Sequence, residues 1–445
     1  MLFRSSAIDA LKAVWHRGAV DADGKTGDGA GIHVDLPVRF FDDAIAAGGH
    51  RVLPNRLAVG MIFLPRTDLG AQEACRTIVE SEIIEAGYTI YGWRQVPVDV
   101  SVIGDKAQRT RPEIEQIMIA NRRGLSGDDL ERNLYLVRRR IEKRVQEEHI
   151  REFYICSLSS RSIIYKGMFL AEQLTAFYPD LLDQRFTSTF VIYHQRYSTN
   201  TFPTWHLAQP FRMLAHNGEI NTLPGNINWM KAHECRLGHP LFGDQIEELK
   251  PIIQPGQSDS ATLDNVFELL CRAGRDAPMA RCMLVPESIS QNAVMPEKHR
   301  DLFSYCNAVM EPWDGPAAMC ATDGRWVIGY MDRNGLRPMR FTVTNEGLLL
   351  LGSEQGMVRV NSQDIVEKGR VGPGEMIGVD LKEGKLFHDR ELKDNLAAKR
   401  PFGQWIKETT YLDSIVKGVK PAKAPDRKST RLNSSHTDIS RMPSS

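Results

Sequence analysis

One short stretch of the chain, residues 194–221, concentrates side chains that could bind and polarise a small polar molecule. It reads HQRYSTNTFPTWHLAQPFRMLAHNGEIN. Arg196 follows an expected strand, and with nearby hydroxyls such as that of Thr199 it could hold a carboxylate. Asn217 and the backbone N–H of Gly218 could donate two hydrogen bonds to one developing oxyanion. The stretch therefore predicts a site that grips a zwitterion and stabilises an oxyanion.

Each of these residues also has a purely structural interpretation. An arginine such as Arg196 is most often part of a surface ion pair. The pair Asn217-Gly218 is typical of a two-residue hairpin turn. Asp259 could pair with a substrate ammonium, but Ser or Asp just before a helix commonly caps that helix. The residue types alone leave both interpretations open at all three places.

Two other motifs are weaker. His233, Cys235 and His239 are metal-ligating residue types, but the expected helix over 226–236 would not bring them to one point, and a fourth ligand is missing. The segment GDGAG at 27–31 lacks both the Lys-Ser/Thr and the preceding strand of a phosphate-binding loop. The sequence therefore predicts no metal site and no phosphate loop.

The elements that must position the central stretch are mostly strands. Asp323-Gly324 between two apolar runs is a strong hairpin signal. The expected strands are 34–37, 57–64, 190–193, 213–215, 317–322, 325–331, 337–343, 348–351, 376–379 and 385–387. The expected helices are 5–15, 70–86, 112–148 with a possible break at 124–127, 226–236, and 261–273 starting at Ser260. Long runs of strands with interspersed helices favour antiparallel sheets covered by helices over a βαβ array.

Composition excludes several classes of protein. The 445 residues are 42% hydrophobic and 25% charged, and Lys+Arg and Asp+Glu both number 56, so net charge favours neither nucleic acid nor a membrane surface as partner. The seven cysteines show no CxxC spacing, no run of 18 apolar residues occurs, and no signal peptide is evident, which predicts a cytoplasmic protein. Residues 426–445 are polar and aperiodic, and we expect a disordered or foreign tail there.

Taken together, these motifs resemble those of the class II glutamine amidotransferases, which are N-terminal-nucleophile (Ntn) hydrolases. The similarity is greatest to the amidotransferase domains of glutamate synthase large subunits. It is carried, in order along the chain, by HRGA at 16–19 with KTGDGAG at 25–31, HQRYSTNTFPTW at 194–205, AHNGEINT at 215–222, QSDSATLDN at 257–265, DRNGLRP at 332–338, SEQG at 353–356 and GPGE at 372–375.

The resemblance implies a fold and a set of roles. The fold would be α+β, a four-layer αββα sandwich of two antiparallel sheets. Arg196 with Thr199 would hold the glutamine α-carboxylate, and Asp259 the α-ammonium. Asn217 and Gly218 would form the oxyanion hole. Two further assignments are that Arg17 and Gly18 would lie beside the nucleophile, and that Trp205 and His206 would belong to a mobile loop at the pocket mouth.

The sequence departs from the family at the nucleophile. The family uses an N-terminal cysteine whose own α-amine acts as the base, which requires a free chain terminus. Residue 1 is Met, and no cysteine precedes Cys75. We expect a fragment truncated at both ends, inactive in hydrolysis, with an amidotransferase domain at 1–400 and the start of a linker at 401–425.

In the complete enzyme, the resemblance implies that glutamine hydrolysis supplies ammonia for 2-oxoglutarate amination. That second reaction would occur in downstream synthase domains of the same polypeptide, with FMN and an iron–sulfur cluster, and with a small NAD(P)H-oxidising subunit as partner. This chain itself would hold no cofactor. The alternatives are the amidotransferase domain of an enzyme that aminates a sugar phosphate, and a non-catalytic glutamine-binding domain.

Overall fold

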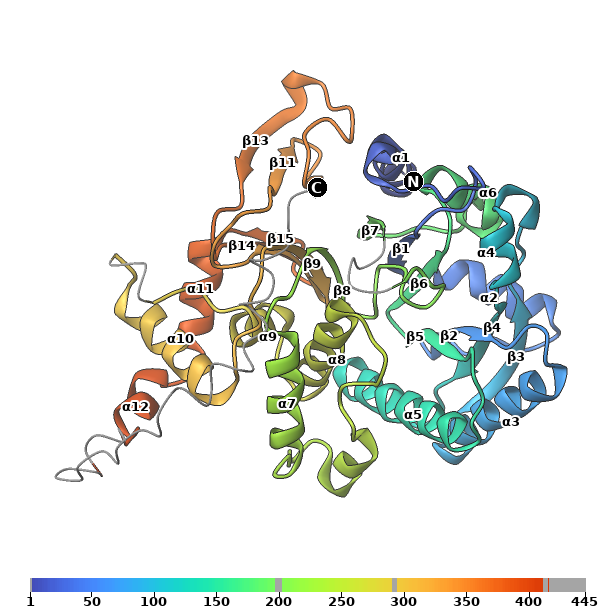
Figure 1. The fold of residues 1–445 in the computed structure, drawn as a ribbon, viewed down its shortest axis with the longest axis horizontal. Coiled ribbons are helices and arrows are strands. Elements are labelled where there is room, and N and C mark those ends of the chain that lie inside the picture. The colour runs from blue at the N-terminus through green and yellow to red at the C-terminus, as the bar shows by residue number, and fades with distance from the viewer. Residues whose placement is uncertain (1, 197–201, 290–293, 411–414, 416–445) are drawn as a thin grey trace, which may run out of the picture. The chain divides into compact units, whose positions relative to one another are not determined.

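A computed structural model describes residues 2–196, 202–289, 294–410 and 415. The chain divides into two compact units, Met1–Phe402 and Gly403–Ser445. The tail expected at 426–445 and much of the linker expected at 401–425 lie outside the described residues. Figure 1 shows the fold, with many of the helices and strands labelled in chain order.

The largest sheet has five antiparallel strands in the order β15-β14-β10-β9-β8. Their bounds are β8 (Leu214–Gly218), β9 (Ala317–Thr322), β10 (Trp326–Met331), β14 (Met376–Asp380) and β15 (Lys385–Phe387). The hairpin predicted at Asp323-Gly324 is confirmed, since β9 pairs with β10 and Gly324 has φ +85°. The hairpin predicted around Gly384 is confirmed as well.

Helices cover one face of this sheet and form the largest core with it. They are α8 (Asp259–Arg272), α9 (Ala277–Leu284), α10 (Glu297–Val309) and α11 (Asp389–Ala398). In α8 the inward face carries Leu263, Val266, Phe267 and Leu270, as its helical spacing predicts. The helix begins slightly earlier than predicted, because Ser258 is the N-cap and accepts a hydrogen bond from the Ala261 N–H.

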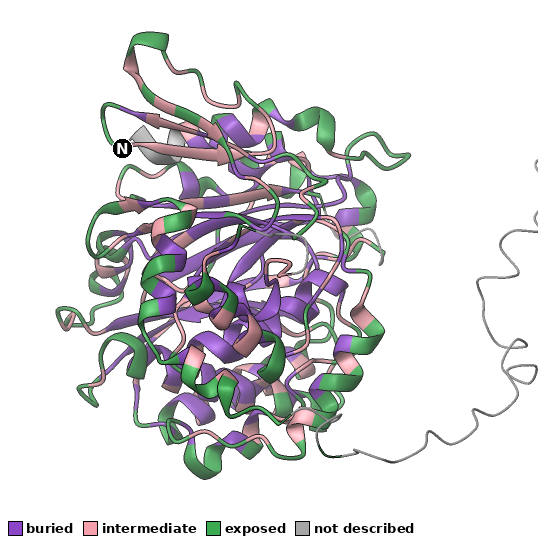
Figure 2. Cartoon of the chain, turned by 90° about the vertical axis from the view of Figure 1, so that its left-hand side faces the viewer, coloured by how far each residue is buried: buried purple, intermediate pink, exposed green. Residues whose placement is uncertain are grey.

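Next to the large sheet lies a three-stranded antiparallel sheet in the order β6-β1-β7. Its strands are β1 (Ala30–Asp35), β6 (Ser162–Gly167) and β7 (Val191–Gln195). A small cluster of Phe190, Ile192 and Ala215 joins β7 to β8, the edge strand of the large sheet. The strands of these sheets are buried along most of their length (Figure 2). Two edge strands, β7 and β8, therefore meet at the predicted site.

A four-stranded antiparallel sheet, β3-β4-β2-β5, carries α3 and α5 on one face. The bounds are β2 (Leu57–Leu64), α3 (Leu69–Glu85), β3 (Thr89–Gln95), β4 (Glu113–Ala120), α5 (Gly127–Glu147) and β5 (Tyr154–Ser159). The single helix predicted over 112–148 is wrong in its first third. Residues 114–120 are all buried, apolar and polar alike, as expected for a central strand of a sheet. The spacing of apolar residues that indicates a helix begins only at Leu130.

The third small sheet, β12-β11-β13, consists of β11 (Arg340–Thr344), β12 (Leu349–Gly352) and β13 (Ile365–Arg370). The remaining α-helices are α1 (Leu2–Ala13), α2 (Val38–Ala47), α4 (Asp105–Arg109), α6 (Leu174–Phe177), α7 (Leu223–Glu234) and α12 (Phe402–Lys407). Among the described residues, no helix is both long and apolar enough to cross a membrane. The predicted α+β class with antiparallel sheets is confirmed.

Candidate functional site

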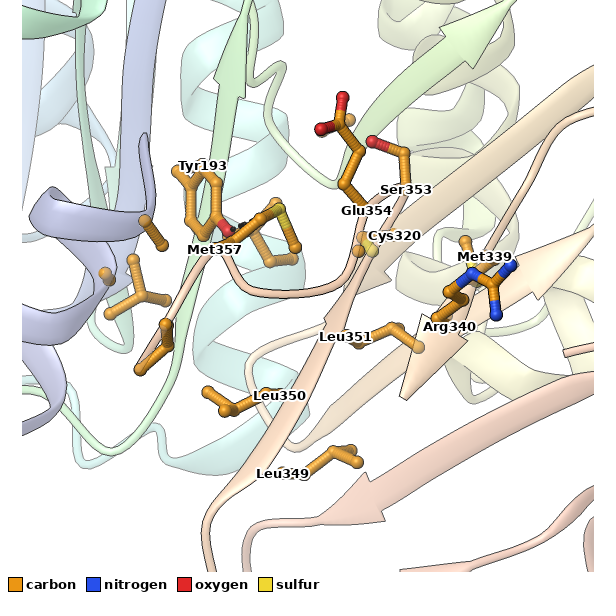
Figure 3. A pocket seen from close by; sticks show the side chains of 18 of the residues that line it. Tyr193, Cys320, Met339, Arg340, Leu349, Leu350, Leu351, Ser353, Glu354 and Met357 are labelled. Atoms are coloured by element: carbon orange, nitrogen blue, oxygen red, sulfur yellow. Dashed lines mark hydrogen bonds between the residues drawn. The ribbon is translucent and has the colours of Figure 1, made fainter. Parts of the chain in front are cut away.

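A cavity of about 620 Å³ lies where β7, β8 and β12 approach α1 and the loop after it. Arg17, Arg196, Asn217 and Gly218 all line it, although Arg17 is far from the other three in the sequence. Figure 3 shows its opposite end, where Leu349, Leu350 and Leu351 follow one another along β12. One end of the cavity is thus polar and the other apolar.

Arg196 follows the last residue of β7 in a strained backbone conformation. Its φ is +105°, which L-residues other than Asn and Asp rarely adopt, and its N–H donates to the Gly29 carbonyl over 2.7 Å. Its Nε lies 3.2 Å from Asp28 Oδ2, and the side chain is 50% exposed. A guanidinium has five N–H donors, and this ion pair uses one of them. The ion-pair interpretation and the carboxylate-binding interpretation are therefore compatible.

Among the described residues, β8 has a strand neighbour on one side only, because it ends the five-stranded sheet. In an antiparallel strand, successive residues direct their N–H and C=O groups to opposite sides. Met213 and Glu219 bond toward the β9 side, through the Thr322 N–H and the Pro316 carbonyl. The alternation therefore directs the backbone N–H of Gly218 toward the free edge, where the cavity lies.

The pair Asn217-Gly218 is not a hairpin turn. Both residues end β8 in register with Ala318 and Ala317 of β9. Gly218 has φ +159°, and a Cβ on it would meet the Pro316 carbonyl oxygen at 1.9 Å. Position 218 therefore requires glycine for close packing. The strand end that carries its N–H is fixed by β9 on the other side.

Asp259 is buried at the N-terminus of α8, and its Oδ2 accepts a hydrogen bond from the Ile220 N–H over 2.9 Å. This bond ties α8 to the chain just after Gly218. Ser258, not Asp259, caps the helix through its side chain. Asp259 does not line the cavity formed by the described residues. The Asp259 carboxylate is thus hydrogen-bonded to the backbone two residues after Gly218. Its contact with a substrate ammonium stays a prediction.

Arg17 and Gly18 reach the site by different contacts. Arg17 forms an ion pair with Glu354, and His16 Nε2 lies 3.1 Å from the same carboxylate. The hydrogen bond from Arg17 lowers the pKa of Glu354. Gly18 packs so closely on Gln195 that a Cβ would meet its Nε2 at 2.0 Å. Glu354 was not predicted as a site residue, although it belongs to the quoted SEQG segment.

His194 connects the two polar halves of the site. Its Nδ1 lies 3.1 Å from the Arg196 carbonyl oxygen, and its ring also hydrogen-bonds to the backbone of His216. Burial lowers the pKa of His194 to about 4, so the ring is neutral near pH 7. One side chain thereby contacts the backbone of both His216 and Arg196.

Thr199 and Trp205 are two further residues of this segment for which the sequence predicts a place at the site. Thr199 lies outside the described residues. The assignment of Trp205 to a mobile loop at the pocket mouth is wrong. Trp205 is 4% exposed, packs on Phe63 and Phe169, and donates from Nε1 to the Ala107 carbonyl over 3.1 Å. An indole buried among aromatic rings gains most by staying in the core.

Cys320 is the cysteine that lines the cavity formed by the described residues. It lies on β9 between the apolar end and Glu354 (Figure 3). Burial raises the pKa of its thiol to about 12. The thiolate is the nucleophilic form of cysteine, so Cys320 is chemically inert near pH 7. Tyr193 and Met357 also line this end, with Oη 3.6 Å from Sδ.

Comparison with known proteins shows the family of the chain. The family described as glutamine amidotransferases class-II matches residues 3–405. The chain belongs to this family. It is 65% identical over 410 residues to the glutamate synthase [NADPH] large chain of Azospirillum brasilense, an alignment that covers 92% of this chain and 27% of that protein.

Other relatives are more distant. The ferredoxin-dependent glutamate synthase 2 of Synechocystis sp. is 44% identical over 419 residues, which cover 92% of this chain and 26% of that protein. Among solved structures, an allosteric regulatory enzyme of purine biosynthesis aligns with a TM-score of 0.31 and 18% identity, over 51% of this chain and 40% of that one. The chain spans about a quarter of the length of the curated relatives it matches.

Proposed function

We propose that this chain is the part of a glutamate synthase that takes ammonia from glutamine. The observation that carries the proposal is that Arg196, Asn217 and Gly218 line one cavity. A cation can hold the carboxylate of an amino acid, and two donors can stabilise the oxyanion that develops when its amide is attacked. The similarity to a glutamate synthase large chain supports the same conclusion.

The proposed roles follow from the positions of the groups. Arg196, with Thr199, binds the α-carboxylate of glutamine, and Asp259 binds the α-ammonium. The carbonyl oxygen of the side-chain amide then lies at the free edge of β8, where Asn217 and the Gly218 N–H stabilise the negative charge that develops on it. A thiolate attacks the amide carbon, and as the C–N bond breaks the nitrogen takes up a proton and leaves as ammonia. The remaining γ-glutamyl thioester is hydrolysed by water to glutamate and the free thiol.

Arg17 and Gly18 would lie beside the attacking thiolate in this scheme. Cys320 does not supply that thiolate, because burial keeps its thiol protonated. We infer that this cavity binds glutamine. A free α-amine next to a cysteine is the activating arrangement that this chemistry uses.

We further propose that the two central sheets form the inner layers of a four-layer αββα sandwich within an amidotransferase domain at 1–400. The helices α8 to α11 on the large sheet, and the apolar cluster between β7 and β8, support this arrangement. In a complete glutamate synthase the ammonia would aminate 2-oxoglutarate in a part of the enzyme that holds FMN and an iron–sulfur cluster. Cytoplasmic localisation stays a prediction, since some relatives are chloroplastic.

Calorimetric titration of the chain with L-glutamine tests the proposal. We expect one binding site. Two analogues test the separate contacts: glutaramate, which lacks the α-ammonium, and 4-aminobutanamide, which lacks the α-carboxylate. Each should bind about 10–100-fold more weakly than L-glutamine, because each loses one charge-assisted contact of about 1.5–3 kcal/mol.

Absence of any heat signal with L-glutamine at millimolar concentration would contradict the proposed function. Equal affinity for glutaramate and L-glutamine would contradict only the role of Asp259. Equal affinity for 4-aminobutanamide and L-glutamine would contradict only the role of Arg196. The D-enantiomer of glutamine is the control for specificity, since it cannot place all three groups at once.

A further inference from the structure

The free edge of β8 carries backbone groups that need partners other than a strand. Leu214 and His216 direct their N–H and C=O groups to the same side as Gly218. The Leu214 N–H donates to Asp264 Oδ1 over 3.1 Å, and the Leu214 carbonyl accepts from the Phe211 N–H over 2.9 Å. A buried edge group left without a partner would cost about 1–3 kcal/mol, so the partners of His216 matter as well.

His216 is held by the side chain of Gln209. The His216 N–H donates to Gln209 Oε1 over 2.7 Å, and Gln209 Nε2 donates to the His216 carbonyl over 3.1 Å. One side-chain amide thus makes the pair of hydrogen bonds that the backbone of an adjacent antiparallel strand would make. Gln209 is 1% exposed and lines the cavity, so water does not compete for these bonds.

The backbone around Gln209 is itself fixed against the other central sheet. The carbonyl oxygen of Gln209 lies so close to Gly31 of β1 that a Cβ there would meet it at 2.6 Å. Three residues earlier, the carbonyl of His206 accepts a hydrogen bond over 2.7 Å from Nζ of Lys166, a buried residue of β6. Gln209 therefore links the β6-β1-β7 sheet to the end of β8, so that the sheet fixes where this strand end lies.

We propose that Gln209 is a positioning residue that replaces a strand partner at the edge of β8 and so aims the Gly218 N–H at the substrate. This inference rests on the proposed function, because Gly218 is taken as an oxyanion donor. In this proposal Gln209 acts through the backbone of His216. It fixes His216, and two residues of extended backbone then set the direction of the Gly218 N–H.

The test uses nuclear magnetic resonance of the whole chain, isotopically labelled, with the variant Gln209→Met. Methionine keeps the length and burial of the side chain but makes neither hydrogen bond. We expect hydrogen exchange of the His216 N–H to become about 10–100-fold faster. We also expect the Gly218 amide resonance, which shifts when L-glutamine binds to the unmodified chain, to lose most of that shift, while the Kd changes less than about threefold.

Gln173→Met is the matched control. Gln173 clamps backbone in the same way, with Oε1 accepting from the Leu170 N–H over 2.8 Å and Nε2 donating to the Val102 carbonyl over 2.8 Å, but it does not line the cavity. It should leave the Gly218 response unchanged. If Gln209→Met does not fold, Gln209→Glu serves instead, since it keeps the acceptor for the His216 N–H and loses the donor to the carbonyl.

For Gln209→Glu we expect near-normal exchange at His216 and a partly reduced Gly218 response. Unchanged His216 exchange in Gln209→Met, or an equal loss of the Gly218 response in Gln173→Met, would overturn the inference. A Gly218 amide that does not respond to L-glutamine even in the unmodified chain would overturn the proposed function instead. In that case exchange at His216 would still report whether Gln209 holds the edge of β8.

Discussion

Arg196 at the cavity and the arginines between α5 and α8 differ in how they are paired and in how far they are exposed. Arg196 is 50% exposed and has an ion pair with Asp28 at 3.2 Å. Arg138, by contrast, is 4% exposed and contacts Glu142 at 2.6 Å and Glu268 at 2.5 Å. The same side chain type therefore serves a cavity in one region and a buried ion network in the other.

The buried network is centred on Glu142. Its two oxygens contact Arg138, Arg139 and Arg212 at 2.6–2.8 Å. Burial alone would raise the pKa of Glu142, but these arginines outweigh burial and lower it to about 2. The network joins α5 to the segment just before β8.

The difference shows what separates a binding arginine from a structural one. A structural arginine has its donors matched by carboxylates of its own chain, so removal of a partner leaves a buried charge. An arginine that binds a ligand is expected to keep unpaired N–H groups and solvent exposure, and to contribute little to the free energy of unfolding. Sequence alone does not distinguish the two, because both kinds occur in segments with alternating or helical patterns.

The largest expected effect is that of Glu142→Gln. The substitution keeps the shape of the side chain and removes the charge that balances three buried arginines, so the free energy of unfolding should fall by about 3–5 kcal/mol. Chemical denaturation measures it, with Glu147→Gln at an exposed position of the same helix as control. A loss below about 1 kcal/mol would show that the network contributes no more than surface pairs do.

Arg196→Ala should separate binding from folding. We expect the Kd for L-glutamine to rise about 10–100-fold, because a charge-assisted contact is worth about 1.5–3 kcal/mol. The free energy of unfolding should fall by about 1 kcal/mol or less, because the guanidinium is half exposed although the Asp28 carboxylate that it leaves behind is buried. A large loss of stability with unchanged affinity would place Arg196 with the structural arginines.

His33 is a buried titratable side chain whose hydrogen-bond partner is a hydroxyl and not a carboxylate. His33 is 1% exposed, its Nε2 lies 2.8 Å from Ser162 Oγ, and burial lowers its pKa from 6.5 to about 3. A lowered pKa means that the unfolded chain binds the extra proton, so stability present above pH 6.5 is lost as the pH falls toward 3.

The variant His33→Phe removes this titration. Between about pH 5.5 and 4.5 the unfolding free energy of the unmodified chain should therefore fall more steeply, by about 1.4 kcal/mol per pH unit, than that of the variant. Denaturation at several pH values measures both slopes. Parallel curves would show that His33 is protonated inside the fold.

The smallest effect is expected for Arg390→Ala. Arg390 is 70% exposed and pairs with Asp394 one helical turn away at 3.2 Å. Such pairs contribute about 0.3–0.5 kcal/mol, and salt screens them. Both the stability and the affinity for L-glutamine should stay within error of the unmodified chain. A weaker affinity would mean that exposed arginines act on the ligand at a distance through net charge.

Much of the fold could be predicted because local signals agreed with it. The Asp323-Gly324 hairpin and the inward face of α8 follow from turn chemistry and from helical spacing. The error at 112–120 arose because EIEQIMIA is buried on a central strand, where no alternation of polar and apolar residues is required. Short apolar runs of this kind do not distinguish a strand from a helix.

The candidate site was predicted only in part. Arg196, Asn217, Gly218 and Arg17 line one cavity, and motif order alone was enough to group them. Trp205 was misplaced because a tryptophan beside a polar motif gives no sign of the aromatic rings that surround it in space. Glu354 and Cys320 were missed as cavity residues, since their contacts span more than a hundred residues of sequence.

By itself, the sequence determined the family, the residue types at the site and most of the antiparallel strands, because these depend on local spacing and on the chemistry of single side chains. Only the tertiary structure decided which groups are directed at the cavity. The direction of the Gly218 N–H depends on β8 being an edge strand, and its fixation depends on Gln209 reaching across from another sheet. Both are consequences of how distant strands pack, which no stretch of sequence encodes locally.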